Sequence, residues 1–288
     1  MISYLLPPTN MPLTNFSRQW SYAYLLAVPV LVTAMAFIVG HVHYSLYLPF
    51  WLLNAGLMIL ATRRLAQPHD RSLRMAAWLF VVPWMLIAVF GGMGPPPETA
   101  IGWAALAGEQ VARYTILIIS GLLTCLGFFR LNLIFAHSPG STFSRTGRWM
   151  MGIALPLFVL NMAYWGYFQT HMFVASTLPG AVKPAWLKPL SDVFTVIRMI
   201  EVALIYLATA AFALAFRRIG WLSKAGSRAY ILLACLGAIL NLLPETVAGP
   251  LAIANYLSYI PAFTLLMPYL IAVNLLHKPA NSLRHVPG

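Results

Sequence analysis

Eight stretches of this chain are apolar enough and long enough to cross a lipid bilayer as helices, and they leave few other folds open. In lipid, a spanning segment must satisfy its own backbone amides, and no stretch alternates as a membrane β-strand does. The chain is 60% hydrophobic and only 8% charged. We therefore predict an all-α, polytopic membrane helix bundle with eight transmembrane helices, near residues 21–39, 44–62, 75–93, 110–129, 149–169, 192–216, 229–244 and 251–276.

Two segments of the chain also resemble each other. Residues 16–37 align without a gap on residues 143–164, and eight positions of the first segment are identical in the second: Phe16, Ser17, Arg18, Ala27, Pro29, Val32, Met35 and Ala36. The pair Arg63-Arg64, with Arg74 after it, recurs as Arg217-Arg218 with Arg228. Pro97-Glu98-Thr99 recurs as Pro244-Glu245-Thr246. This pattern indicates a tandem duplication.

Each copy holds four predicted spans, so both copies have the same orientation and form parallel repeats. We place the first four-helix repeat at 16–140 and the second at 141–278, with an outer insertion at 171–191 and cytoplasmic tails at 1–15 and 279–288. Residues 98–110 predict a short helix at the outer interface, anchored by Trp103. Kinks are expected where prolines stand inside the spans, at Pro29, Pro83, Pro156, Pro261 and Pro268.

The basic residues fall in alternate loops. Fourteen of the 18 lie on one side of the predicted topology: Arg18, Arg63, Arg64, Arg71, Arg74, Arg130, Arg145, Arg148, Arg217, Arg218, Lys224, Arg228, Lys278 and Arg284. The positive-inside rule makes this side cytoplasmic, with both termini inside the cell. The formal charge of +12 thus reflects topology in a cytoplasmic (inner) membrane, with the lipid bilayer rather than a nucleic acid as partner. The amino terminus has no pattern of a cleavable signal.

Histidines stand at the outer ends of the predicted spans in both copies. His41 and His43 lie between the first two spans, and the duplication brings His171 to nearly the same depth. Neutral imidazole binds transition metals and haem iron, so these three residues are candidate ligands of haem or copper. A histidine at the end of a span can also lie at the headgroup level simply because its ring is amphipathic.

The segment FIVGHVHYSLYLPFWLLNAG, residues 37–56, resembles the helix of haem-copper oxidase catalytic subunits that carries a His-x-His-Tyr-x-Leu motif. It is also similar to the Trp-His-x-His segment of NnrS-type membrane proteins. The resemblance implies cofactor-binding roles for His41 and His43, in electron transfer or in nitric-oxide or oxygen chemistry with a respiratory partner. His171 has no such match. The chain lacks the copper-site motifs of the oxidases and has two four-helix units where they have three.

A second candidate site lies in the sixth predicted span, where Arg198 and Glu201 fall on one face of a helix. An unpaired charge at the centre of a bilayer costs about 2.5–3.5 kcal/mol on insertion scales, so we expect the two to pair. Asn54, Asn161 and Asn241 could extend this network. The pair favours a small-solute or proton-coupled transporter as the alternative function. A structural subunit of a membrane complex is a third possibility. Hydrolase, nucleotide-binding, prenyltransferase and retinal-binding motifs are absent from the sequence.

Overall fold

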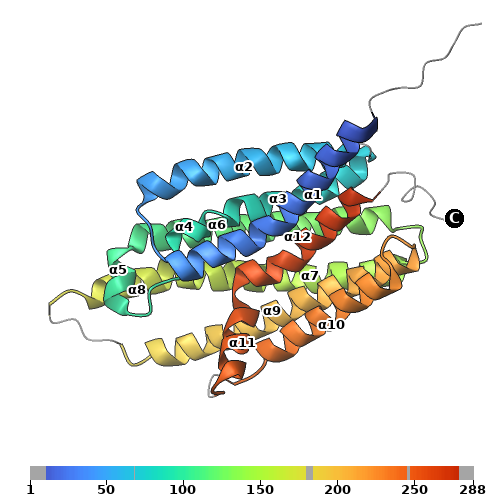
Figure 1. The fold of residues 1–288 in the computed structure, drawn as a ribbon. Coiled ribbons are helices and arrows are strands. Elements are labelled where there is room, and N and C mark those ends of the chain that lie inside the picture. The colour runs from blue at the N-terminus through green and yellow to red at the C-terminus, as the bar shows by residue number, and fades with distance from the viewer. Residues whose placement is uncertain (1–10, 68, 180–183, 245–246, 279–288) are drawn as a thin grey trace, which may run out of the picture.

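The computed structural model describes residues 11–67, 69–179, 184–244 and 247–278, and all regular structure in these ranges is helical (Figure 1). Most helices run along one long axis and form an elongated bundle. The all-α prediction is confirmed.

In the first half of the chain, the described part begins with a helix at Met11, which includes residues 11–15 of the predicted tail, while residues 1–10 lie outside the described part. Its segments are α1 (Met11–Ala34), the π-helix η1 (Met35–Val39), α2 (Tyr44–Ala66), α3 (Arg71–Ile87), α4 (Phe90–Met93), α5 (Ala100–Ala105) and α6 (Ala107–Ile134).

The second half repeats the combination of an α-helix followed by a π-helix. Its segments are α7 (Ser141–Ala163), the π-helix η2 (Tyr164–Gln169), α8 (Thr170–Ser176), α9 (Leu187–Arg218), α10 (Lys224–Asn241), α11 (Pro250–Tyr259) and α12 (Pro261–His277). The predicted insertion at 171–191 contains most of α8 and the start of α9, while its residues 180–183 lie outside the described part of the chain.

Among the described residues, six helical segments are long and apolar enough to cross a membrane: 17–39, 44–66, 71–93, 107–134, 141–176 and 187–218. The pair α11–α12 makes a seventh if it is one span, although it bends by 67° at the break before Pro261. That bend confirms the kink expected at Pro261. The predicted span at 229–244 corresponds to α10, which includes Lys224, Arg228 and Asn241 and is not among these segments. The structure thus supports a multi-pass membrane protein, while a count of eight is not confirmed.

Helix α9 lies at the centre of the bundle and packs against α7 on one side and α10 on another, while α3 packs against α6 and α12. Large aromatic side chains fill the contact between α6 and α9: Phe128, Phe135, Phe212 and Phe216. At the α7–α9 contact Gly147 has no side chain, and a Cβ atom there would lie 2.6 Å from the ring of Phe212. Close approach of these two helices therefore depends on this glycine.

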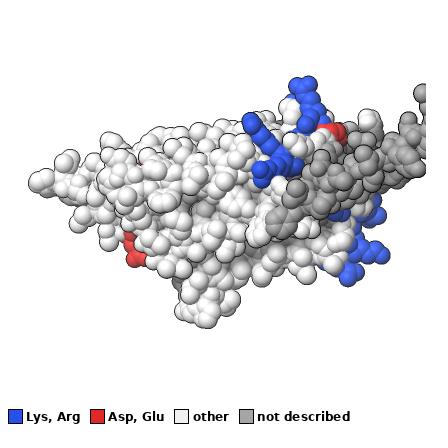
Figure 2. Space-filling model, turned by 45° about the horizontal axis from the view of Figure 1, so that its top comes forward, with Lys and Arg blue, Asp and Glu red and all other residues white. Residues whose placement is uncertain are grey.

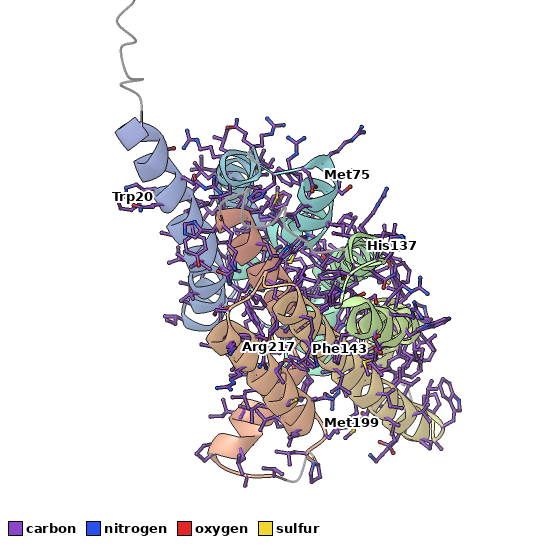
Figure 3. The ribbon with its side chains drawn as sticks, turned by 90° about the vertical axis from the view of Figure 1, so that its right-hand side faces the viewer. Trp20, Met75, His137, Phe143, Met199 and Arg217 are labelled. Carbon is purple, nitrogen blue, oxygen red and sulfur yellow. The ribbon has the colours of Figure 1, made fainter. Side chains whose placement is uncertain are left out.

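Helix α2 lies at one edge of the bundle (Figure 1). The segment from α1 to α2 exposes apolar side chains. Ile38 is 82% exposed, and Phe50 and Leu53 on α2 are also largely exposed. Trp20 projects from α1 away from the other helices (Figure 3) and is 62% exposed. Exposed side chains of this kind suit contact with lipid, since the helices carry few charges that would oppose it.

Basic side chains gather at the end of the bundle where α1 begins and α12 finishes (Figure 2). We call this end the basic end. It also contains the α2–α3, α6–α7 and α9–α10 connections, and most arginines of the described ranges lie in the helix ends that adjoin them. The opposite end contains the η1–α2 connection, α4, α5 and α8. The alternation of basic loops expected from the sequence therefore places the charges at one end of the molecule.

Trp103 on α5 was expected to anchor the chain at the membrane surface, and this expectation is wrong. Its side chain is 6% exposed, and its Nε1 donates a hydrogen bond of 2.8 Å to Thr170 Oγ1 on α8. The short helix itself is present, but it packs against α8. The indole packs against the aromatic rings of Tyr114 and Trp165. These contacts favour burial between helices over a position at the membrane surface.

Candidate functional site

A cavity of about 570 Å³ lies inside the bundle, between segments from both halves of the chain. Its wall includes the end of α1, with Val32 and Ala36, and the end of α7, with Asn161 and Met162. Helices α3, α6, α9, α11 and α12 complete it. Exposed ionisable residues, Glu98, Lys188 and Asp192, are part of the wall, so the cavity reaches the surface at the opposite end of the bundle.

Glu201 on α9 is fully buried and lines this cavity. Its Oε1 accepts a hydrogen bond of 2.9 Å from Asn161 Nδ2 on α7. Its Oε2 has no hydrogen-bond partner within the described residues, and the same is true of Asn161 Oδ1. Burial of polar atoms without partners is costly, so two adjacent acceptor atoms without donors mark a place where a ligand can supply them.

Arg198 lies one turn before Glu201 on α9 and lines the same cavity. Its guanidinium carbon lies 3.8 Å from the centroid of the Tyr259 ring at the end of α11. This short cation–π contact ties α9 to the bent α11–α12 segment. The structure thus brings Arg198 and Glu201 to one cavity, while their direct ion pairing stays a prediction.

Arg113 on α6 is a further ionisable residue of the wall, and it is not among the site residues predicted above. It is 5% exposed, and its Nη2 donates hydrogen bonds to the carbonyl oxygens of Gly94, at 2.8 Å, and Met93, at 3.4 Å. Its guanidinium carbon lies 5.0 Å from the centroid of the Phe90 ring. Arg113 Nε has no partner among the described residues. The signal was present, since an arginine stands three residues inside a predicted span.

Close backbone packing surrounds the carbonyl groups that bind Arg113. Gly94 ends α4 with φ +64°, and a Cβ atom there would lie 2.8 Å from the backbone nitrogen of His41. The backbone nitrogen of Val42 donates a hydrogen bond of 2.8 Å to the carbonyl of Gly92. The η1–α2 connection therefore packs directly on α4, whose terminal carbonyls receive the guanidinium of Arg113.

Aromatic and charged side chains line the rest of the cavity. Trp84, Trp103, Tyr114 and Trp165 contribute aromatic side chains from α3, α5, α6 and η2. Near the surface, Lys188 Nζ lies 3.4 Å from Asp192 Oδ1, one turn along α9. Of the two acids in the recurring Pro-Glu-Thr triplet, Glu98 lines the cavity, whereas Glu245 lies outside the described residues.

The three candidate histidines are exposed, and none lines the cavity as described. His41 Nε2 lies 3.0 Å from Glu109 Oε2, which links the η1–α2 connection to α6. His43 caps α2, with Nδ1 2.7 Å from Ser45 Oγ, and His171 is on α8. Within the described ranges, no three His, Cys, Asp or Glu side chains lie together as a group that could hold a metal ion.

Comparison with known proteins adds no family to this description. No protein-family model, curated protein sequence or solved structure matches the chain.

Proposed function

We propose that this chain is a multi-pass membrane protein that binds a small solute in the central cavity and carries it across the bilayer. One observation carries the proposal: the buried carboxyl group of Glu201 lines a cavity of about 570 Å³ and leaves Oε2 without a described partner. Ligand sites of small molecules have volumes of about 300–1,000 Å³, with mostly apolar walls and a few polar groups. An ionisable residue inside a membrane span is by default a functional residue.

The predicted duplication supports a carrier of this kind. The aligned segments 16–37 and 143–164 both contribute to the wall near their ends, with Val32 and Ala36 from the first and Asn161 and Met162 from the second. A mid-helix proline precedes a π-helix in each, Pro29 before η1 and Pro156 before η2. We propose that two parallel repeats enclose the cavity, as in carriers built from repeats related by an axis along the membrane normal.

We also propose that the basic end faces the cytoplasm, so that the cavity opens to the outside in the conformation described. The gathering of arginines and lysines at this end supports this orientation through the positive-inside rule (Figure 2). A solute would then enter between Glu98 and the Lys188–Asp192 pair and meet Glu201 deeper in the bundle.

Thermal unfolding of the detergent-purified chain tests binding. The probes are four classes of solute at millimolar concentration: amino acids, amines, short carboxylates and monosaccharides. A ligand that binds only the folded state raises the unfolding temperature. We expect at least one class to do so for the wild type but not for Glu201→Gln. Asp70→Asn, which changes an acid at the basic end outside this cavity and keeps the Oδ1 acceptor that caps α3, should respond as the wild type does.

Two results would refute the proposal: no response to any class, or an unchanged response in Glu201→Gln. Uptake of the active solute into vesicles that contain the purified protein then distinguishes a carrier from a protein that only binds.

Haem or copper binding through His41, His43 and His171 stays a prediction. Its test is the reduced-minus-oxidised absorption spectrum of the purified protein, together with metal analysis. A sharp reduced α-band lost in His43→Ala and His171→Ala, but kept in His69→Ala, would establish it.

A further inference from the structure

We infer that the solute is a small zwitterion with a primary ammonium group, a carboxylate and an apolar body about the size of an aromatic ring. This inference rests on the proposed function and specifies its substrate class. It comes from three features of the cavity wall: unpartnered acceptors at one place, an unpartnered donor at another, and aromatic side chains in the same wall.

The acceptors are Glu201 Oε2 and Asn161 Oδ1. Their side chains are joined by the 2.9 Å hydrogen bond from Asn161 Nδ2 to Glu201 Oε1, so the two free acceptor atoms belong to one hydrogen-bonded unit. Both residues are at least 99% buried. An ammonium group carries a positive charge and three N–H donors, and it can therefore serve both atoms at once. A neutral hydroxyl has a single donor and leaves one of them without a partner.

The donor is Arg113 Nε, which is buried and without a described partner. The Nη2 atom of the same guanidinium is held by the carbonyls of Met93 and Gly94, which accept hydrogen bonds but do not neutralise the charge. Glu109, one turn before Arg113 on α6, acts on its charge, but its Oε2 lies 3.0 Å from His41 Nε2 and it gives Arg113 Nε no hydrogen bond. A ligand carboxylate is the group that satisfies both the donor and the charge of a guanidinium.

Among the described residues, the formal charges of the wall balance, which agrees with a ligand that has no net charge. Three acids, Glu98, Asp192 and Glu201, and three bases, Arg113, Lys188 and Arg198, line the cavity. An amine without a carboxylate would leave Arg113 Nε without an acceptor, and a carboxylate without an amine would leave Glu201 Oε2 and Asn161 Oδ1 without donors. Trp84, Tyr114 and Trp165 offer flat apolar surface for the body of the ligand.

Three probes with one ring and different charged groups test the inference: tyrosine, tyramine, which lacks the carboxylate, and 3-(4-hydroxyphenyl)propionate, which lacks the ammonium. Equilibrium dialysis of radiolabelled tyrosine with the purified full chain measures its affinity, and competition measures the other two. We expect tyrosine to bind at least about tenfold more tightly than either analogue, because each analogue leaves buried hydrogen-bonding atoms of Glu201 and Asn161 or of Arg113 without a partner.

Two variants test which residue binds the ammonium group and which binds the carboxylate of the ligand. In Glu201→Gln, the ratio of the affinity for tyrosine to that for the propionate should fall to about threefold or less. In Arg113→Gln, the ratio of the affinity for tyrosine to that for tyramine should fall to about threefold or less. If Arg113→Gln does not fold, the wild-type ranking of the three probes still decides the question.

The outcomes separate this inference from the proposed function. If tyramine or the propionate binds as well as tyrosine, or if tyrosine does not bind, the zwitterion is refuted. In that case, the cavity would still be upheld as a binding site if another solute class raised the unfolding temperature of the wild type but not that of Glu201→Gln. If no solute of any class binds, both proposals fail.

Discussion

Asn161 Nδ2 is the one hydrogen-bond donor to Glu201 that the described residues provide, which makes this contact a sensitive point of the bundle. Asn161→Leu removes the donor and leaves the buried carboxyl group without it. We expect a loss of about 1–3 kcal/mol in the free energy of unfolding, measured by denaturant titration in detergent.

The double variant Asn161→Leu with Glu201→Leu serves as the control for this prediction. It should regain part of the lost stability, because replacing both polar partners by apolar groups leaves nothing unsatisfied. A double variant that is less stable than Asn161→Leu alone would show that the two residues do not act as a pair.

His69 gives the molecule a pH-dependent contact outside the spanning segments. Its Nε2 lies 2.9 Å from the carbonyl oxygen of Leu276, joining the α2–α3 connection to the end of α12. Burial lowers the pKa of His69 below its ordinary value of 6.5. The hydrogen bond to Leu276 and the charge of Asp70 oppose this shift, whereas Arg18 and Arg74 add to it.

The unfolded chain therefore binds a proton at His69 at a higher pH than the folded chain does. The contribution of neutral His69 is fully present above pH 6.5 and is lost as the pH falls through the lower pKa of the folded state. We expect the unfolding temperature of the wild type to fall more between pH 7.5 and pH 5.5 than that of His69→Gln. Equal falls would contradict this reading of His69.

At the scale of helices, the contact of α7 with α9 depends on the absence of a side chain at Gly147. An added Cβ atom would lie 2.6 Å from the Phe212 ring and 3.0 Å from the carbonyl oxygen of Ala208. We expect Gly147→Ala to destabilise the bundle by about 1–3 kcal/mol, because the helices must separate or the ring must shift. The measurement is the midpoint of thermal unfolding in detergent.

Gly152, on the same helix, provides a matched control. A Cβ atom at this position meets only the ring of Phe129, at 3.8 Å, which is an ordinary contact distance. Gly152→Ala should leave the midpoint unchanged or raise it slightly, since alanine favours a helix over glycine. Similar losses in both variants would mean that close packing at Gly147 is not the cause.

The helices follow from the sequence more directly than the cavity does. Long apolar stretches between basic loops locate six spanning segments, and Pro261 predicts the bend between α11 and α12. Pro29 and Pro156 suggest kinks, but not the π-helices that follow them, because a π-helix depends on how the next turn packs. Arg198 and Glu201 are visible as charges in an apolar stretch. Arg113 is harder to recognise in the sequence, because an arginine near the start of a span resembles one at a helix end.

The cavity itself requires knowledge of which helix faces meet. Asn161 contacts Glu201 because α7 and α9 pack closely, and Tyr259 reaches Arg198 only because the chain breaks before Pro261. Neither fact is contained in the spacing of residues along a single helix. The same holds for the histidines, whose positions in the predicted repeats do not specify the contacts that His41 and His43 make with Glu109 and Ser45.

For the whole molecule, the gathering of charges predicts which end faces which compartment. Single cysteines at Leu178, exposed after α8, and at Lys224, exposed at the start of α10, report the opposite end and the basic end. They are introduced into a chain in which Cys125 and Cys235 are replaced by serine. Under the positive-inside rule, a membrane-impermeant maleimide added to intact cells should label Leu178→Cys. It should label Lys224→Cys only after permeabilisation, and the reverse pattern would place the mouth of the cavity in the cytoplasm and invert the proposed direction of entry.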